Sequence, residues 1–577
     1  MTMPYALPKP TTTQTEKPKA HRDSLRELVE TFVFVVVLVL MLKLFVVEAF
    51  VIPTGSMAET ELGYHKNVQC EQCGYKFPVN SSDEEEGRKG VKVPIVGYHC
   101  PNCNFPGKLK VVNQGSKDAP FFRTELESTS GDRVLVHKAM PINQRGSVVV
   151  FKFPKEPQID QIAQNYIKRL VGFGGETIAI YHGKLFVHKS LEYPKEQYPR
   201  PPDEKDVWQE RYTYPQAEVA STAFESAKQL GFPENAKGFE LIRKPDNQVL
   251  AMKRIVYDND HQAQDLIKLG VPPRWKTSGT GWDAAVAGQT SYNHTGPERA
   301  FLKYEHLVVK NKAIPDVLSS RTRDLPKNAS DFIPTSVVPS KITNLLGYNS
   351  GVRGDFHYSD RGTENSDNND HWVGDLIVEC KAMIADPTAT VILDLARGPS
   401  RFQAQFANGT VKLVRTGAGG KELASRPTTM TKAGQYALRF ANVDCRLRVW
   451  VDDKAIDFGK ESDYAYEAPK TFDNADSKHE GWTTANDINE PAAIEVQGNV
   501  TISNITLWRD TYYTHNESGP RGGDLDTYYV HPGHFLCFGD NSAQSSDGRT
   551  WGQVPERLML GRAVFVFWPF ARIGFIN

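Results

Sequence analysis

Apolar and polar residues follow two distinct patterns along this chain. Between Thr31 and Phe50 nearly every residue is apolar, and the only charges, Lys43 and Glu48, lie near the end of the run. At about 1.5 Å per residue, a helix of this length crosses a hydrocarbon layer of about 30 Å. A buried core helix would rarely be apolar on every face. A cleaved signal peptide would have a shorter apolar run followed by a small-residue cleavage site. The pattern therefore predicts a transmembrane helix over residues 31–50.

From residue 249 onward the chain contains short stretches in which apolar and polar residues alternate. These stretches are AMKRIVY, HLVV, DLIVECKAMI, ATVILDLARG, RFQAQFANG, QYALRFANV, RLRVWVDD and VTISNITLWRD. Alternation bounded by Asn, Asp and Gly is typical of antiparallel strands, and this many strands favour two packed sheets. The pattern predicts a β-sandwich over residues 249–515. The preceding residues 191–248 are interpreted as a linker rich in proline and charge, with a helix over 217–230.

Charge indicates how the chain lies in a membrane and argues against one class of partner. The residues before the apolar run include five basic ones, Lys9, Lys17, Lys19, Arg22 and Arg26. The positive-inside rule therefore places the tail, residues 1–30, in the cytoplasm and everything after Phe50 on the outer side. The whole chain carries 68 basic and 69 acidic residues, so its charge gives no support for a nucleic-acid partner.

Two stretches contain residues that could perform chemistry together. The membrane run leads directly into FVIPTGSMAETEL (50–62), where Ser56 stands between a glycine and a methionine. A serine hydroxyl needs a base to become a nucleophile, and none of the histidines lies in a triad motif such as GxSxG. In YIKRLVGFGGETIAI (166–180), Lys168 has apolar neighbours, and burial would lower its pKa toward the working pH. Taken alone, each residue has an ordinary alternative, a structural turn serine and a surface lysine.

Four sequence blocks and the C-terminal stretch together resemble one known family. They are FVIPTGSMAETEL, GDRVLVHK (131–138), YIKRLVGFGGETI and GDNSAQSSDGRTWG, and the ending is GRAVFVFWPF (561–570). In this order behind a single anchor helix, they resemble type I signal peptidases, the membrane-anchored Ser/Lys proteases of the S26 type that remove leader peptides. The resemblance implies a β-rich catalytic core in three parts, residues 51–66, 107–190 and 516–577.

The resemblance also implies roles for individual residues. Ser56 would be the acylating nucleophile, Lys168 the general base, and Ser545 the serine that orients the lysine amine. The Thr54 hydroxyl and the Ser56 backbone N–H would stabilise the oxyanion, and no cofactor is needed for catalysis. Further matching positions are Asp132, Asp540, Asp547 and Arg549.

The sequence departs from the family pattern in two places. Gly174-Gly175-Glu176 replaces the usual Pro-Gly-Asp, which is expected to loosen that turn. Because Ser542, Ser545 and Ser546 are close neighbours, the choice of Ser545 rests on alignment alone.

Residues 67–106 contain two CxxC pairs, and we interpret them as an inserted zinc-ribbon-like segment. Cys70 and Cys73 are separated by 26 residues from Cys100 and Cys103. Four thiolates in this arrangement suit a tetrahedral structural zinc with no open position. A pair of disulfides is the alternative, because the segment is expected in an oxidising compartment. For the scattered cysteines, the pairing of Cys380 with Cys445 is a further alternative, and Cys537 is interpreted as a buried apolar residue.

Together these interpretations predict a mainly β protein with one N-terminal transmembrane helix, a catalytic core, a zinc ribbon and a large inserted sandwich. The run LRFANVDCRLRVWVDDKAIDF followed by TISNITLWRD resembles the laminin-G or concanavalin-like jelly roll, which includes carbohydrate binders. A sandwich without a ligand is the alternative, since fold does not imply function.

The expected activity is removal of signal peptides after small residues of an A-x-A-like site, at the outer face of a bacterial cytoplasmic membrane. Expected partners are preprotein signal peptides, the lipid bilayer, the translocon if the ribbon is a docking module, and a carbohydrate ligand of the sandwich. The alternative function is a surface-anchored glycan- or cell-wall-binding protein.

Overall fold

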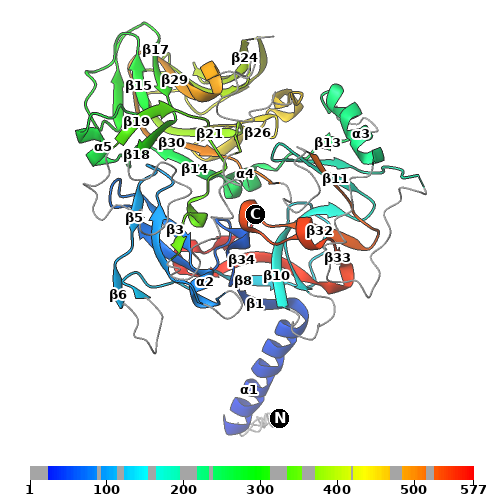
Figure 1. Cartoon of the computed structure of the whole chain (residues 1–577). Helices are drawn as coiled ribbons and strands as arrows, with labels where there is room; N and C mark the ends of the chain where they lie inside the picture. The colour runs from blue at the N-terminus through cyan, green and yellow to red at the C-terminus, as the bar shows by residue number, and fades with distance from the viewer. Residues whose placement is uncertain are drawn as a thin grey trace, which may run out of the picture.

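The computed structural model describes most of the chain, and Figure 1 shows its arrangement. The described residues are 24–87, 92–113, 123–153, 164–194, 218–232, 238–311, 334–353, 371–417, 420–467, 484–514 and 525–577. A long helix, α1, projects from one end of a body built almost entirely of sheets. The predicted mainly β fold with one N-terminal apolar helix is confirmed. The predicted cytoplasmic tail, residues 1–30, lies mostly outside the described residues.

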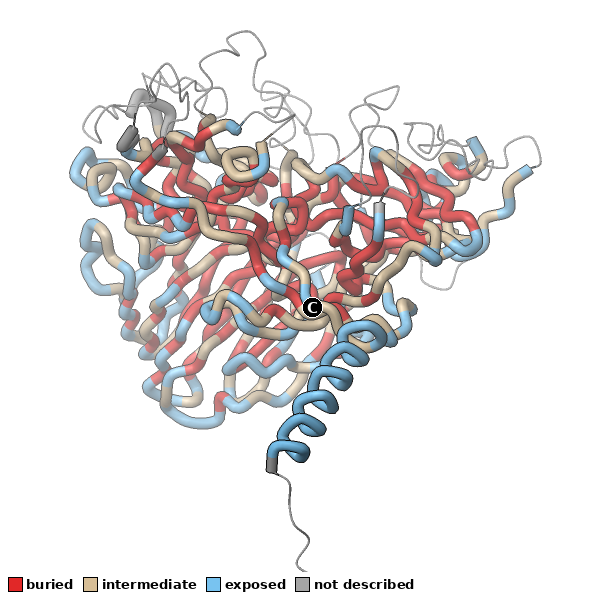
Figure 2. The backbone as a smooth tube through the Cα atoms, turned by 90° about the horizontal axis from the view of Figure 1, so that it is seen from below, coloured by how far each residue is buried: buried red, intermediate tan, exposed pale blue. Residues whose placement is uncertain are grey.

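The N-terminal helix is shifted toward the start of the chain relative to the prediction. Helix α1 (Ser24–Met41) continues into a wider turn (Leu42–Val46), and the chain then becomes β1 (Val47–Val51). Residues Leu25–Val46 are long and apolar enough to cross a membrane, and none is buried against the body (Figure 2). The last residues of the predicted span, 47–50, form a strand because β1 pairs with β8 (Arg133–His137) in the largest sheet of the body. Hydropathy alone cannot predict this strand pairing, because an apolar strand and an apolar helix have the same hydropathy.

Two sheets contain strands that precede and follow the large insertion. The larger is antiparallel, and β10 lies inside it between β9 and β32. In spatial order its strands are β1, β8 (Arg133–His137), β34 (Met559–Trp568), β9 (Val148–Phe153), β10 (Gln164–Phe173), β32 (His534–Phe538) and β33 (Val554–Pro555), with β35 (Gly574–Phe575) beside β34. The smaller sheet contains β13 (Glu240–Leu241), β12 (Lys184–His188), β11 (Thr177–Tyr181) and β31 (Leu525–Tyr529). Residues separated by more than 300 positions therefore pair directly.

Two seven-stranded sheets form the predicted sandwich. The first is β14 (Arg254–Asp258), β30 (Val500–Arg509), β21 (Leu376–Ile384), β26 (Gly434–Val443), β27 (Arg446–Val451) and β28 (Lys454–Ile456), with β16 (Ser291–His294) beside β30. The second is β15 (Trp275–Ser278), β17 (Ala300–Tyr304), β29 (Ala492–Gln497), β22 (Thr390–Arg397), β23 (Ser400–Ala407), β24 (Thr410–Gly417) and β25 (Lys421–Pro427). Residues of β23 are alternately buried and partly exposed, as the sequence alternation requires.

The sandwich core is a continuous apolar cluster between these sheets. It includes Phe402, Phe406 and Phe440, together with Cys380. Cys445 belongs to a separate cluster with Phe224 and Phe232, so Cys380 and Cys445 are free thiols in different places. Cys537 is fully buried among apolar residues, as the sequence indicates.

Small elements connect the larger sheets. The cysteine-rich segment contains β2 (His65–Gln69), β3 (Lys76–Asn80), α2 (Ser82–Glu85), β4 (Ile95–His99) and β5 (Pro106–Lys108). Strand β20 (Val352–Arg353), from the distant insertion, pairs with β4, which sequence analysis did not anticipate. The remaining elements are β6 (Val111–Asn113), β7 (Arg123–Thr124), β18 (Leu307–Asn311), β19 (Pro334–Pro339), α3 (Glu218–Gln229), α4 (Asp246–Met252), α5 (Gln264–Lys268) and α6 (Gly548–Trp551). Helix α3 coincides with the predicted helix over 217–230.

Candidate active site

Ser56 and Lys168 meet in the interior of the protein. Ser56 lies in a single 3-10 turn, Gly55–Met57, directly after β1, and Lys168 lies in the middle of β10. Lys168 Nζ lies 2.6 Å from Ser56 Oγ and donates a second hydrogen bond to the Ile167 carbonyl, with N···O 3.0 Å. Two residues 112 positions apart are thereby brought into direct contact.

The surroundings of Lys168 favour its neutral form. Its side chain is almost completely buried, and the apolar residues Met57 and Ile167 are buried in the adjoining cluster. Burial lowers the pKa of Lys168 to about 8, although the carboxylate of Asp547 acts in the opposite direction. Desolvation disfavours the charged amine and therefore accounts for the direction of the shift. A lysine with this pKa is partly neutral near pH 8 and can accept a proton.

Asn541 donates hydrogen bonds to two consecutive backbone carbonyls in the turn that contains Ser56, which we call the nucleophile turn. Its backbone N–H donates to the Ser56 carbonyl at 3.0 Å, and its side-chain Nδ2 donates to the Gly55 carbonyl at 2.9 Å. Gly539 permits this close approach, since a Cβ there would lie 2.4 Å from the Ser56 oxygen and 2.1 Å from Ser545 Oγ. The Gly-Asp-Asn motif therefore contacts the nucleophile turn directly. The residue types alone did not predict this contact.

The three neighbouring serines occupy different environments. Ser542 Oγ accepts hydrogen bonds from the Thr514 backbone N–H at 2.9 Å and from Arg549 Nη1 at 2.6 Å. Ser546 is exposed. Ser545 Oγ is buried beside Gly539 and forms no hydrogen bond of ordinary geometry among the described residues, but it lies close enough to the Asp547 carboxyl to help lower its pKa. The hydrogen bond to Lys168 that the resemblance implies for Ser545 is therefore not formed, because Lys168 binds Ser56 and the Ile167 carbonyl instead.

Thr54 stands at the entrance to the same turn. Its backbone is extended, its side chain is exposed, and it forms no capping hydrogen bond to the turn. The Thr54 hydroxyl is therefore not engaged by the turn that contains Ser56.

Three ion pairs surround the site. Arg169 follows Lys168 in β10 and binds Asp540 in a bidentate manner, with N···O distances of 2.7 and 2.6 Å. Asp547 accepts from Arg549 at 2.9 and 2.7 Å and from the Gly539 N–H at 2.8 Å. The third pair joins Asp132 to Arg572 at 2.9 Å. All three acidic residues match positions identified through the family resemblance.

Sequence analysis missed a buried glutamate between two of these ion pairs. Glu61 is almost fully buried, and its Oε2 has no hydrogen-bond partner in the described part of the chain. Burial, with a further contribution from the Asp540 carboxylate, raises the pKa of Glu61 to about 8. Glu61 is therefore largely protonated at neutral pH. The signal was present in the block MAETEL, but a glutamate near a turn is ordinarily exposed.

The turn after β10 is held by the side chain of Glu176, which stands where the family pattern has an aspartate. Glu176 accepts from the Phe173 N–H at 2.8 Å and from Arg145 Nη2 at 2.7 Å. Gly175 has φ +90°, a conformation that glycine adopts without strain. The expected loosening of this turn is offset by these contacts.

The four clustered cysteines gather in a buried site of their own. All of their Sγ atoms lie within 4.8 Å of one another, and the Cys70–Cys103 and Cys73–Cys100 distances are each 3.6 Å. A disulfide requires about 2.05 Å between its sulfurs. Four sulfurs about 2.3 Å from one tetrahedral zinc would be about 3.8 Å apart. The donor set and its spacing fit a metal ion, and all four thiols are free.

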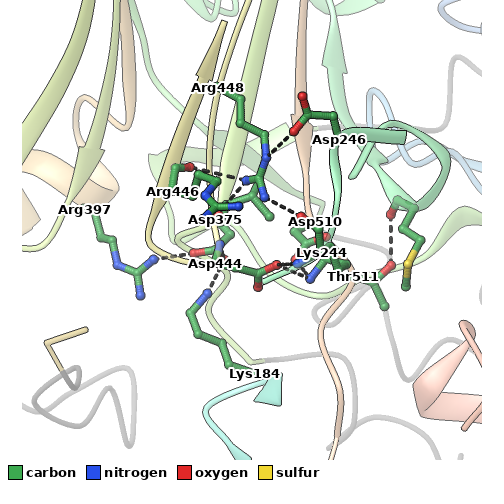
Figure 3. Close-up of polar contacts among 12 residues, drawn as sticks. Lys184, Lys244, Asp246, Asp375, Arg397, Asp444, Arg446, Arg448, Asp510 and Thr511 are labelled. Atoms are coloured by element: carbon green, nitrogen blue, oxygen red, sulfur yellow. Dashed lines mark hydrogen bonds and ion pairs between the residues drawn. The ribbon is translucent and has the colours of Figure 1, made fainter. Parts of the chain in front are cut away.

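A second cluster of acidic residues joins the sandwich to the smaller catalytic-side sheet (Figure 3). Asp375, Asp444 and Asp510 follow or precede sandwich strands and are buried. Lys184 of β12 and Arg397 of β22 both bind Asp375, and Lys244 binds Asp444 at 2.7 Å and Asp510 at 2.8 Å. Three cations therefore neutralise three carboxylates, so the cluster is a charge network between domains.

Part of the chain is similar to a known protein family. Residues 124–252 and 445–568 match the family model described as Signal peptidase, peptidase S26. These residues make up less than half of the chain. They include Lys168 and Ser545, whereas Ser56 lies before them.

Curated relatives agree with this match. The chain is 35% identical over 81 residues to a probable signal peptidase I-2 of Synechocystis, covering 14% of this chain and 35% of that protein. It is 46% identical over 61 residues to signal peptidase I of Pseudomonas aeruginosa, covering 10% and 20%. It is 44% identical over 49 residues to mitochondrial inner membrane protease subunit 1 of Mus musculus, covering 8% and 30%. The matches thus span about a third or less of these relatives.

Solved structures resemble this chain only weakly. The carbohydrate-binding module CBM66 of Bacillus subtilis has 9% identity and a TM-score of 0.21, with coverage of 41% of this chain and 94% of that chain. The Caenorhabditis elegans galectin LEC-6 has 16% identity and a TM-score of 0.16, with coverage of 23% and 83%. Likenesses at this level assign no ligand to this chain.

Proposed function

We propose that this protein is a membrane-anchored serine endopeptidase that removes signal peptides from preproteins by a Ser/Lys mechanism. The observation that carries the proposal is the 2.6 Å contact between Lys168 Nζ and Ser56 Oγ at a buried lysine whose pKa is lowered to about 8. The family match and the relatives named above agree with the reaction class. The three-part core, residues 51–66, 107–190 and 516–577, belongs to this proposal.

In the proposed reaction Ser56 Oγ attacks the scissile carbonyl carbon while Lys168 Nζ takes the hydroxyl proton. The oxyanion is stabilised by the Ser56 backbone N–H and by Thr54, whose hydroxyl is not engaged by the turn. Collapse of the intermediate breaks the C–N bond, and the leaving amine takes the proton from Lys168. A water then gives a proton to Lys168 and attacks the ester carbonyl carbon. The ester C–O bond breaks, and Ser56 Oγ takes the proton back from Lys168, which regenerates both residues. Ser545, whose buried Oγ lies beside Gly539, would orient the amine of Lys168.

The position of the site suits substrates held in a bilayer. The apolar helix ends at Val46, and Ser56 follows only ten residues later. Trp568, Phe570 and Phe575, near the end of the chain, are exposed apolar residues. An apolar segment of a preprotein in the same membrane would present its small-residue cleavage site near Ser56, which raises the effective concentration. The expected orientation places the catalytic body outside a bacterial cytoplasmic membrane.

The experiment that tests this function compares the wild type with Ser56→Ala on a preprotein bearing an Ala-x-Ala site, in detergent or liposomes. Cleavage at that site by the wild type alone is the expected result. If the folded wild type left the preprotein intact, or if Ser56→Ala cleaved equally well, the assignment would be refuted.

We also propose that Cys70, Cys73, Cys100 and Cys103 hold one structural zinc ion. The proposal is supported by four free, buried thiols spaced as tetrahedral ligands would be. Metal analysis of the purified chain is expected to find one zinc per molecule, and Cys73→Ser is expected to lose it. Four oxidised cysteines without metal, detected by mass spectrometry, would contradict the proposal.

A further inference from the structure

A short stretch of the large insertion, residues 342–353, packs against the catalytic centre, and we name it the bridging segment. At its start Ile342 belongs to the sandwich core, and Arg509 Nη2 donates to the Asn344 and Leu345 carbonyls at 2.8 and 2.7 Å. At its end β20 pairs with β4 of the cysteine-rich segment. The bridging segment is therefore fixed at both ends by folded parts that the catalytic core does not supply.

Between these ends a 3-10 turn, Gly347–Asn349, packs on the nucleophile turn. Tyr348 is fully buried, and a Cβ on Gly55 would lie 2.2 Å from its Cε1 atom. The Tyr348 hydroxyl donates to the Tyr64 carbonyl at 3.2 Å. Tyr348 also shares an apolar cluster with Ala58 and Leu62, which follow Ser56. The insertion thus forms one wall of the turn that contains Ser56.

The next residue reaches the catalytic core through a reciprocal pair of amides. Asn349 Nδ2 donates to Asn541 Oδ1 at 2.6 Å, and Asn541 Nδ2 donates to Asn349 Oδ1 at 2.8 Å. The same Asn541 Nδ2 donates to the Gly55 carbonyl. With both of its side-chain atoms engaged by Asn349, the Asn541 amide has a fixed orientation that directs Nδ2 toward the nucleophile turn.

We propose that Asn349 is a positioning residue for the reaction: it orients Asn541, which in turn holds the Gly55-Ser56 backbone for attack. This inference rests on the proposed peptidase function. It adds that the large insertion helps to position the catalytic residues. A shift of about 1 Å in a nucleophile can cost about a hundredfold in rate, so an amide that fixes its backbone affects kcat. Loss of an interaction that only positions the nucleophile lowers kcat, so KM is expected to change little.

The test compares Asn349→Ala, the isosteric Asn349→Asp and Ser350→Ala in the full chain. Ser350 lies in the same turn, but it contacts the His99 N–H at 3.3 Å and the Gly347 carbonyl at 2.6 Å instead of Asn541. We expect both Asn349 variants to lower kcat roughly tenfold to a hundredfold, with KM and Tm close to those of Ser350→Ala. Ser350→Ala is expected to retain wild-type kcat.

A double-mutant cycle with Asn541→Ala separates positioning from general stability. If Asn349 acts through Asn541, adding Asn349→Ala to Asn541→Ala is expected to lower kcat no further. Hydrogen exchange of a peptide covering residues 52–62 is expected to accelerate in Asn349→Ala and not in Ser350→Ala. Equal kcat in Asn349→Ala and the wild type, or equal losses in the Asn349 and Ser350 variants, would overturn the inference. A wild type that cleaves nothing would refute the peptidase function, and the exchange measurement would still test the contact.

Discussion

Lys168 and Arg169 are consecutive in β10, and their side chains serve different partners on the two faces of the strand. Lys168 Nζ contacts Ser56 Oγ, whereas Arg169 forms a bidentate ion pair with Asp540. Because adjacent residues of a strand point to opposite faces, one strand positions the proposed base, Lys168, and also anchors the motif that contacts the turn containing Ser56. Both side chains are almost completely buried. Burial affects them differently, since only the arginine is paired with a carboxylate.

Replacing the proposed base should separate activity from stability. We expect Lys168→Met to abolish cleavage and to stabilise the fold at pH 7 by roughly 3 kcal/mol, because it removes a buried amine that is charged at that pH. Cleavage assays and thermal unfolding measure the two effects. The matched control is Lys152→Met on the neighbouring strand β9, where the lysine is exposed. It is expected to change neither property, and cleavage by Lys168→Met would refute the role of Lys168 as base.

The pH dependence of cleavage follows from the pKa of Lys168, which burial lowers to about 8. The base is active when neutral, so kcat/KM is expected to rise with pH through about 8 and then level off. The folded chain binds fewer protons at Lys168 than the unfolded chain between about pH 8 and 10.5. This group therefore adds stability as pH rises through that window. A pH profile that is flat from 6 to 9 would contradict the assignment.

Glu61 should show the opposite dependence on pH. Its folded pKa is raised to about 8 from 4.5, so between these values the folded chain binds more protons than the unfolded chain. Its contribution to stability falls as pH rises through this range and stays lowest above pH 8. Between pH 5 and 9, we expect the free energy of unfolding of Glu61→Gln to rise relative to that of the wild type by on the order of 2–4 kcal/mol.

Denaturant unfolding at several pH values measures the gain of the Glu61 variant. The exposed Glu422 supplies the control, and Glu422→Gln is expected to show no such gain. A constant difference between Glu61→Gln and the wild type at every pH would show that Glu61 does not titrate as described.

The charge network of Asp375 should be essential for joining the sandwich to the catalytic core. Removing the Asp375 charge leaves Lys184 and Arg397 buried without their carboxylate. We expect Asp375→Asn to destabilise the protein by about 3–5 kcal/mol, as measured by denaturant unfolding. The control is Asp453→Asn, which removes an exposed partner of Arg439 and is expected to cost less than about 1 kcal/mol. Equal effects of the two variants would show that the network contributes little.

The sequence by itself determined the features that depend on local pattern. Alternation predicted β21, β22, β23, β26, β27 and β30, because a two-residue period fits a sheet with one buried face. The apolar run predicted α1, and the two CxxC pairs predicted one cluster of cysteines. The block order indicated Ser56 and Lys168 as partners before their distance was known.

Only the tertiary structure decided which distant residues support those partners. Asn349 meets Asn541 across 192 positions, and nothing in either local sequence specifies the contact. The same holds for β20, which joins β4 from the far side of the insertion. It holds also for Glu61, which is buried near two ion pairs whose members come from distant parts of the chain. Periodicity and motifs predict the local structure of each segment from residues that are close together in sequence. Burial and long-range hydrogen bonds arise only when the sheets have assembled.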